Sequence, residues 1–135
     1  MSKQNSEQDI INQYRANIEK IENDYSALIK RERSLDEERE NIFSFRRAFR
    51  EYIDDANNWY DYPLEAKQLE EIMAEHRLLI EFEEGMEMDI RQAEQRNEEK
   101  YEELQSEKKS LQVKEDLETE EYQKQLRNLQ KRNTI

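Results

Sequence analysis

Few residues in this sequence have the types and spacing that catalysis or metal binding requires. Zinc sites use clustered cysteine and histidine, but the chain has one histidine, His76, and no cysteine. A di-iron site needs Glu-x-x-His on two helices, and the residue three positions before His76 is Met73. Glu71 and Glu75 share a helical face, yet so acidic a sequence produces such pairs by chance. We therefore interpret His76 as part of an apolar helical seam.

The sequence also lacks the motifs for phosphate binding, calcium binding and nucleophilic catalysis. A phosphate-binding loop needs several glycines, and the chain has only Gly85. The Asp-x-Asp-x-Asp-Gly run of a calcium loop is absent. A nucleophile also needs a pocket that holds it beside its base, and the sequence offers no credible pocket. We expect no enzymatic activity, no metal and no cofactor.

Composition favours long helices. Of the 135 residues, 41 % are charged and 34 % apolar, whereas an ordinary globular domain is about 45–50 % apolar. One glycine and one proline provide for about one sharp reversal, and sheet folds need turns at frequent intervals. Periodicity must then decide between helix and disorder.

The first part of the chain carries a regular helical pattern. Between Ile11 and Leu28, apolar residues recur at intervals of three and four, which is typical of a coiled-coil seam. The same steps then land on polar residues such as Glu32, which weaken a seam but restrict its register. Because Ser6 is a suitable N-cap, we expect a first helix over about 7–57.

An aromatic stripe follows, offset from the first seam. Its members step by three and four residues, and they are Ile42, Phe45, Phe49, Tyr52 and Ala56. Arg46, Arg47 and Arg50 interleave with the rings, as in some proteins that bind single-stranded nucleic acid. Because the rings fall largely on one face and acidic residues follow at once, we interpret them as packing residues.

The best candidate for a reversal is the segment 57–63. Its Asn and Asp residues favour turns, and Pro63 suits the first position of a new helix. We expect a second helix over about 64–132, in which Gly85 permits a close backbone approach or marks a bend. The prediction is a single all-α domain over 1–135, a long antiparallel helical hairpin or coiled coil.

Folding the chain about residue 60 sets an expected pairing. It brings Ile42 near Leu78 and Phe49 near Glu71, and it leaves residues beyond about 115 without a partner in the chain. We therefore expect the ring-rich bend and the apolar tail to bind partners. The predicted partner-binding residues are Phe45, Phe49, Trp59, Tyr60, Leu117, Tyr122, Leu126 and Leu129.

Charge and hydropathy constrain the partners. The net charge of −12 disfavours nucleic acid and anionic membranes. The segment from Glu65 to Glu103 holds 14 acidic and 5 basic residues, which we interpret as a solvated face, with a docking face for a basic partner as the alternative. The longest apolar run, residues 78–80, is too short for a membrane span or a secretory signal. We expect a soluble cytoplasmic protein, with co-export without a signal peptide left open.

An acidic helical hairpin with tryptophan near its bend resembles proteins of Gram-positive type VII secretion. The WXG100-like members carry Trp-x-Gly in the turn, where this chain has Trp59, Tyr60 and Asp61. The length and the long charged second helix are closer to small accessory proteins encoded beside LXG toxins. That resemblance implies a protein that binds the helical LXG domain of a toxin, together with a second small accessory, and aids export.

None of the Phe and Tyr residues begins an export signal of these families. One accessory class carries Phe-x-x-x-Asp and the WXG100 class Tyr-x-x-x-Asp/Glu, and no position here fits either. The resemblance thus implies a chaperone or scaffold without its own signal. Two other functions stay open: a structural coiled-coil homodimer, and an acidic inhibitor or antitoxin of a basic partner.

Overall fold

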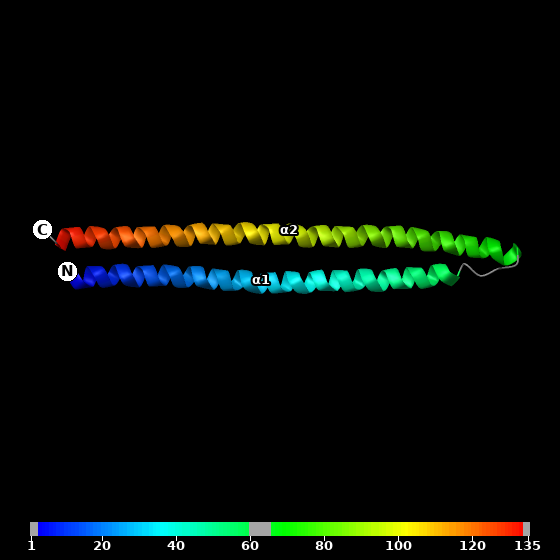
Figure 1. The fold of residues 1–135 in the computed structure, drawn as a ribbon, viewed down its shortest axis with the longest axis horizontal. Coiled ribbons are helices and arrows are strands. Elements are labelled where there is room, and N and C mark those ends of the chain that lie inside the picture. The colour runs from blue at the N-terminus through cyan, green and yellow to red at the C-terminus, as the bar shows by residue number, and fades with distance from the viewer. Residues whose placement is uncertain (1–2, 60–65, 134–135) are drawn as a thin grey trace. The chain divides into compact units, whose positions relative to one another are not determined.

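The protein consists of two long helices. The computed structural model describes residues 3–59 and 66–133, and these form α1 (Lys3–Trp59) and α2 (Ala66–Asn133). The helices pack against each other and run in opposite directions (Figure 1). The expected all-α fold, a long antiparallel helical hairpin, is confirmed.

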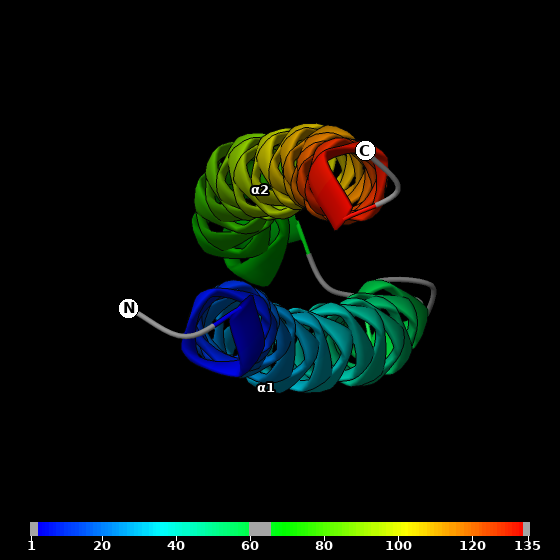
Figure 2. The ribbon, with the colours of Figure 1, turned by 90° about the vertical axis from the view of Figure 1, so that its left-hand side faces the viewer.

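Contacts within the chain fall into two units. The terminal unit comprises residues 3–33 of α1 and 101–133 of α2, and the central unit comprises 34–59 and 66–100. In the terminal unit, the start of α1 lies beside the end of α2 (Figure 1), and Figure 2 views these two helix ends along the helices.

The first helix begins earlier than Ser6 predicts. α1 starts at Lys3, so Ser6 lies inside the helix instead of capping it. The amide of Gln8 donates a hydrogen bond to Asn12 Oδ1 at 2.9 Å, and such pairs, four residues apart, stabilise a helix near its end. The expected start at about residue 7 therefore lies in the second turn of α1.

The helix ends flank the expected reversal. α1 ends at Trp59 and α2 begins at Ala66, two and three residues from Asn57 and Pro63. Residues 60–63 of the expected turn lie outside the described residues, as do residues 64 and 65. At the other end of α2, the last turn carries two basic residues, which suit the negative end of a helix.

One seam runs along α1 without an offset. Ile21, Leu28, Leu35 and Phe49 are buried, and their positions differ by multiples of seven. The expected offset of the aromatic stripe is wrong. The seam positions on the two sides of Phe49 belong to Arg46, which is partly buried, and to Ile53, which is buried, whereas Phe45 and Tyr52 are exposed.

Arg46 fits the seam because only its head is polar. A guanidinium group can reach the edge of a seam while the methylene stem covers apolar surface. Here Nη2 of Arg46 lies 2.8 Å from Oε1 of Glu94 in α2. Arg46 therefore occupies the seam position that the heptad spacing assigns to it, and the aromatic ring of Phe45 is exposed beside it.

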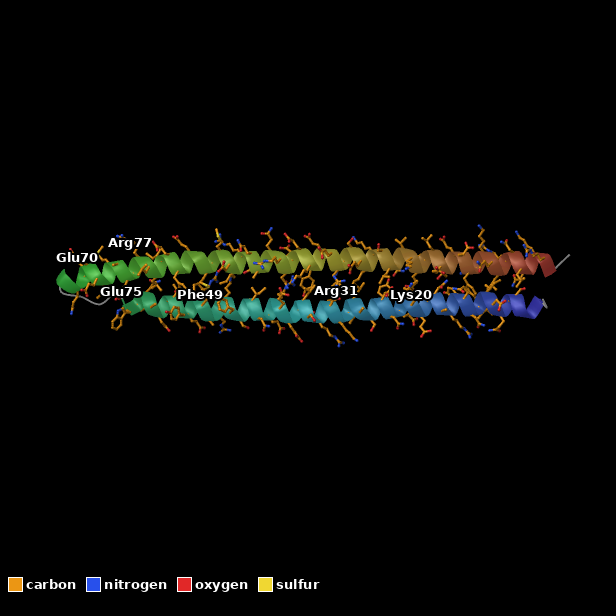
Figure 3. All side chains as sticks on the ribbon, turned by 180° about the vertical axis from the view of Figure 1, so that it is seen from behind. Lys20, Arg31, Phe49, Glu70, Glu75 and Arg77 are labelled. Carbon is orange, nitrogen blue, oxygen red and sulfur yellow. The ribbon has the colours of Figure 1, made fainter. Side chains whose placement is uncertain are left out.

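The core of the central unit comes from both helices. Phe49 and Ile53 of α1 pack with Ile90 of α2, and three partly buried residues pack against this cluster, namely Ile42, Leu79 and Met86. The ring of Phe82 meets the ring of Phe49 edge-on, with centroids 5.8 Å apart. Figure 3 shows Phe49 on α1 in this unit.

The register between the helices differs from the expected one. Phe49 meets Phe82 and not Glu71, so the pairing about residue 60 is wrong. The side chains of Asn57 and His76 are hydrogen-bonded at 3.2 Å. Since α1 ends two residues after Asn57 but α2 begins ten residues before His76, α2 extends further past this pair.

This register pairs the C-terminal tail within the chain. The rings of Tyr14 and Tyr122 stack with centroids 4.0 Å apart, and the Tyr14 hydroxyl is hydrogen-bonded to Thr119. The amide of Asn17 donates to Glu118 at 2.9 Å. The expectation that residues beyond about 115 lack a partner in the chain is therefore wrong.

Tyr25 adds a polar contact to the terminal unit. Its hydroxyl donates to Gln112 Oε1 at 3.3 Å. Desolvation, followed by the carboxylates of Glu115 and Asp116, raises the pKa of Tyr25 above its usual value of 10.0. The phenol therefore stays protonated, as the hydrogen bond requires, throughout the neutral pH range.

Buried Asn97 marks the register of the central unit. Its side chain is 3 % exposed, and Nδ2 donates to the carbonyl oxygen of Leu35 at 3.1 Å. A single polar residue in a coiled-coil seam fixes register and association state and lowers stability. Across the helices, Lys100 and Glu38 form an ion pair nearby at 3.7 Å.

Phe49→Ala should destabilise the protein far more than Leu117→Ala. Phe49 is 7 % exposed within the central cluster, whereas Leu117 is 60 % exposed. Truncating a buried phenylalanine costs roughly 3–5 kcal/mol, and exposed substitutions stay within about 0.5 kcal/mol. Urea unfolding followed by circular dichroism measures both. Equal midpoints for the two variants would contradict this packing.

Asn97→Leu should raise thermal stability while loosening specificity. Leucine at this position buries more apolar area, but it removes the hydrogen bond to Leu35 that distinguishes one register from another. We expect a higher melting temperature together with mixed association states by light scattering. A variant that is both less stable and uniform in mass would show that Asn97 serves stability.

Gly85 lies within continuous helix and has open space around it. A Cβ added there would meet no atom within 4 Å, so the expected close approach of a backbone from this chain is wrong. Gly85→Ala should stabilise the protein by about 1 kcal/mol, because alanine restricts the unfolded chain and favours helix. Glu84→Ala, at an exposed neighbouring position, is the control. A lower melting temperature for Gly85→Ala would contradict the prediction.

Candidate functional site

The described residues offer no arrangement for metal chemistry. Among them, no group of three or more His, Asp or Glu side chains could hold a metal ion. His76 is half-buried at the seam, beside Asn57. Neither described helix contains a stretch long and apolar enough to pass through a bilayer. The grooves and exposed side chains of the central unit form the candidate functional site.

Exposed apolar side chains gather in the central unit. Of 13 large apolar side chains that the structure describes as exposed, 10 belong to this unit. They are Phe43, Phe45, Tyr52, Trp59, Leu69, Met73, Leu78, Ile80, Phe82 and Met88. Exposed apolar side chains mark an interaction site where they adjoin one another, whereas isolated ones are common on any surface.

Three of these side chains form a line along α1. Phe45, Tyr52 and Trp59 occur at every seventh position, so they lie above one another beside the seam. Their exposed fractions are 49, 59 and 65 %. We call these three residues the aromatic ridge.

From Asn17 to Glu38, the same heptad position of α1 is polar. It holds Asn17, Asp24, Arg31 and Glu38, of which Asn17, Arg31 and Glu38 contact α2 within their own units. Asn17 bonds to Glu118, Arg31 pairs with Glu107, and Glu38 pairs with Lys100. The position thus changes from polar side chains that find partners in α2 to aromatic side chains that remain exposed.

A groove lies beside the aromatic ridge. It has a volume of about 280 Å³, and Phe45 forms part of its lining. The other lining residues are Glu38, Asn41, Ile42, Met86, Asp89, Ile90 and Ala93. The rings of Phe45 and Phe49 stack with centroids 6.3 Å apart, which links the ridge to the core of the central unit.

The opposite flank of the seam is arginine-rich. A second groove there, of about 340 Å³, is lined by Arg39, Phe43 and Arg46 together with Glu94 and other polar residues. The Nε atom of Arg46 is buried and lacks a hydrogen-bond partner among the described residues. The two flanks of the central unit therefore differ in charge.

The structure separates the predicted partner-binding residues. Phe45, Trp59 and Leu117 are exposed, and the first two share the ridge. Phe49 is buried in the core, and Tyr122 is stacked on Tyr14.

The other predicted residues lie in the terminal unit or outside the described residues, and one exposed ring was not predicted. Leu126 and Leu129 are half-buried in the terminal unit, and Tyr60 lies outside the described residues. Tyr52 was not among the predicted residues. Its seven-residue spacing from Phe45 and Trp59 was the signal that could have identified it.

The chain was compared with protein families, curated proteins and solved structures. No protein family, curated protein or solved structure matches the chain. The chain is thus defined as an all-α helical hairpin with an exposed aromatic ridge.

Proposed function

We propose that this protein is a non-catalytic helical binding protein, an accessory that binds the helical LXG domain of a type VII secreted toxin. In this role it acts in the cytoplasm as a chaperone or scaffold, alongside a second small accessory protein. The aromatic ridge carries the proposal, because it leaves three large rings exposed on a helix whose seam is already filled.

The physical argument rests on what covers these rings. Covering apolar surface stabilises by roughly 25 cal/mol per Å², and aromatic side chains dominate the energetics of interfaces. A long hairpin presents such residues along helices, which suits a partner that is itself helical. The acidic surface disfavours nucleic acid and anionic membranes as partners.

Two alternatives have support in particular observations. A structural coiled-coil homodimer would cover the same exposed rings with a second copy. An acidic inhibitor or antitoxin would use the excess of carboxylates on α2 against a basic partner. Solution mass and the salt dependence of binding distinguish these alternatives from a helical accessory.

Mixing the protein with the purified helical domain of its LXG toxin partner should give a stable complex. We expect one peak in size-exclusion chromatography whose mass exceeds either component, because the exposed rings become covered. The catalytic domain of the same toxin is the control and should not bind. A chain that forms a tight homodimer and ignores the helical domain would contradict the proposal.

A further inference from the structure

We propose that the aromatic ridge and Phe82 of α2 form a docking groove for one amphipathic helix of another protein, whose apolar side is flanked by lysine and arginine. The inference rests on the proposed function as a binding protein. It adds to that function the surface that binds and the chemistry of the partner.

Side chains of both helices lie around the groove of about 280 Å³. On α1, Phe45 of the ridge belongs to its lining, and on α2, Phe82 lies next to Phe49 in the same unit. Both rings contact Phe49, Phe45 by stacking at 6.3 Å and Phe82 edge-on at 5.8 Å. Ile42 and Met86 also belong to the lining of the groove and pack against the core.

The spacing of the ridge fits a helix as occupant. A strict coiled-coil seam uses two apolar positions per heptad, and α1 has a third one at the ridge. A stripe of that width can pack against two neighbours, of which α2 is one. From Phe45 to Trp59 the ridge extends about 21 Å at 1.5 Å per residue, which corresponds to about four turns of a docked helix.

Carboxylates lie on both sides of Phe82 along α2. Glu75 and Asp89 lie seven residues before and after Phe82, so the three occupy one line along α2. Among the side chains that the structure describes, neither carboxylate has an ion-pair partner. Asp89 also lines the groove itself.

Three arginines near the groove in sequence lie elsewhere. Arg46 lines the opposite groove, and Arg47 pairs with Glu51 on its own helix. Figure 3 shows Glu75 on the side of α2 that turns toward α1, whereas Arg77 lies on the side turned away. The docking groove is therefore apolar between acidic borders, and basic flanks complement it.

Charge also argues against a second copy as the occupant. Two copies related by a twofold axis would bring the groove of one molecule against the groove of the other. The carboxylates of Glu75 and Asp89 would then lie near the same pair of carboxylates of the other copy, and each chain carries a net charge of −12. Like charges across an interface suppress that pairing.

The single tryptophan provides a natural reporter. Trp59 is the only tryptophan in the chain and lies in the ridge. The probe is a synthetic amphipathic peptide of about four helical turns, without tryptophan, with leucines flanked by lysines. We expect its binding to shift the Trp59 emission to shorter wavelength and to weaken with added salt. The same peptide with glutamates in place of lysines should not bind.

Matched variants test the aromatic ridge. Tyr52→Ser removes a ridge residue, and Phe43→Ser removes an equally exposed ring from the arginine-rich flank. We expect Tyr52→Ser to weaken peptide binding about tenfold or more, the size of an aromatic hot spot, and Phe43→Ser to leave it unchanged. Circular dichroism checks that both variants are folded.

A second pair tests the acidic borders with two variants that change the net charge equally. Glu75→Lys with Asp89→Lys reverses the charges beside Phe82, and Glu70→Lys with Glu84→Lys reverses two exposed carboxylates at other positions of α2. We expect the first double variant to weaken binding of the lysine peptide about tenfold more than the second.

Three outcomes would overturn the docking groove. The first is equal binding of the lysine and glutamate peptides. The second is an equal loss of peptide affinity in both members of either matched pair of variants. The third is a homodimer that Tyr52→Ser dissociates. A toxin-domain complex that survives both Tyr52→Ser and the Glu75–Asp89 reversal would also overturn the groove and leave the proposed function standing. Peptide binding without any toxin-domain complex would support the groove and contradict the toxin partner.

Discussion

The narrow apolar seam between α1 and α2 is the constraint on which the rest of this structure depends. Each helix is mostly charged, and isolated helices gain little stability in water without packing. The buried side chains of α1 lie at heptad spacing, and they meet a matching stripe on α2 within each unit. Because the seam is narrow, the side chains next to it are not needed for burial, and they become available for pairing within the chain or for contact with a partner.

Polar side chains decide which of several possible registers the seam adopts. Apolar stripes with a seven-residue repeat can match after a shift of one heptad, so burial alone distinguishes registers poorly. In the central unit, Asn97 interrupts the apolar stripe of α2, and in the observed alignment its amide donates to the carbonyl oxygen of Leu35. In the terminal unit, the observed alignment pairs Asn17 with Glu118 and stacks the rings of Tyr14 and Tyr122.

The helices and the seam could be predicted from sequence, but their register could not. Counting outward from an assumed turn at residue 60 places Phe49 opposite Glu71, whereas its contact is Phe82. The count fails because α2 extends past the end of α1, a feature that no local spacing encodes. The assignment of Phe45 to the seam fails for another reason: the aliphatic stem of Arg46 occupies the position that the heptad already assigns. The seven-residue spacing of Phe45, Tyr52 and Trp59 is present in the sequence, but spacing alone does not show which heptad position is buried.

The two units therefore solve the same packing problem with different consequences. Along one heptad position of α1, the terminal unit places polar side chains that bond to α2, so that flank is satisfied by the chain itself. The central unit places Phe45, Tyr52 and Trp59 at that position, where α2 leaves them exposed. Phe49 and Ile53 fill the seam beneath these rings, and Phe45 also stacks on Phe49. Because exposed rings lower solubility and charged residues are abundant elsewhere on both helices, three rings in one line distinguish this flank of the central unit from the rest of the described surface.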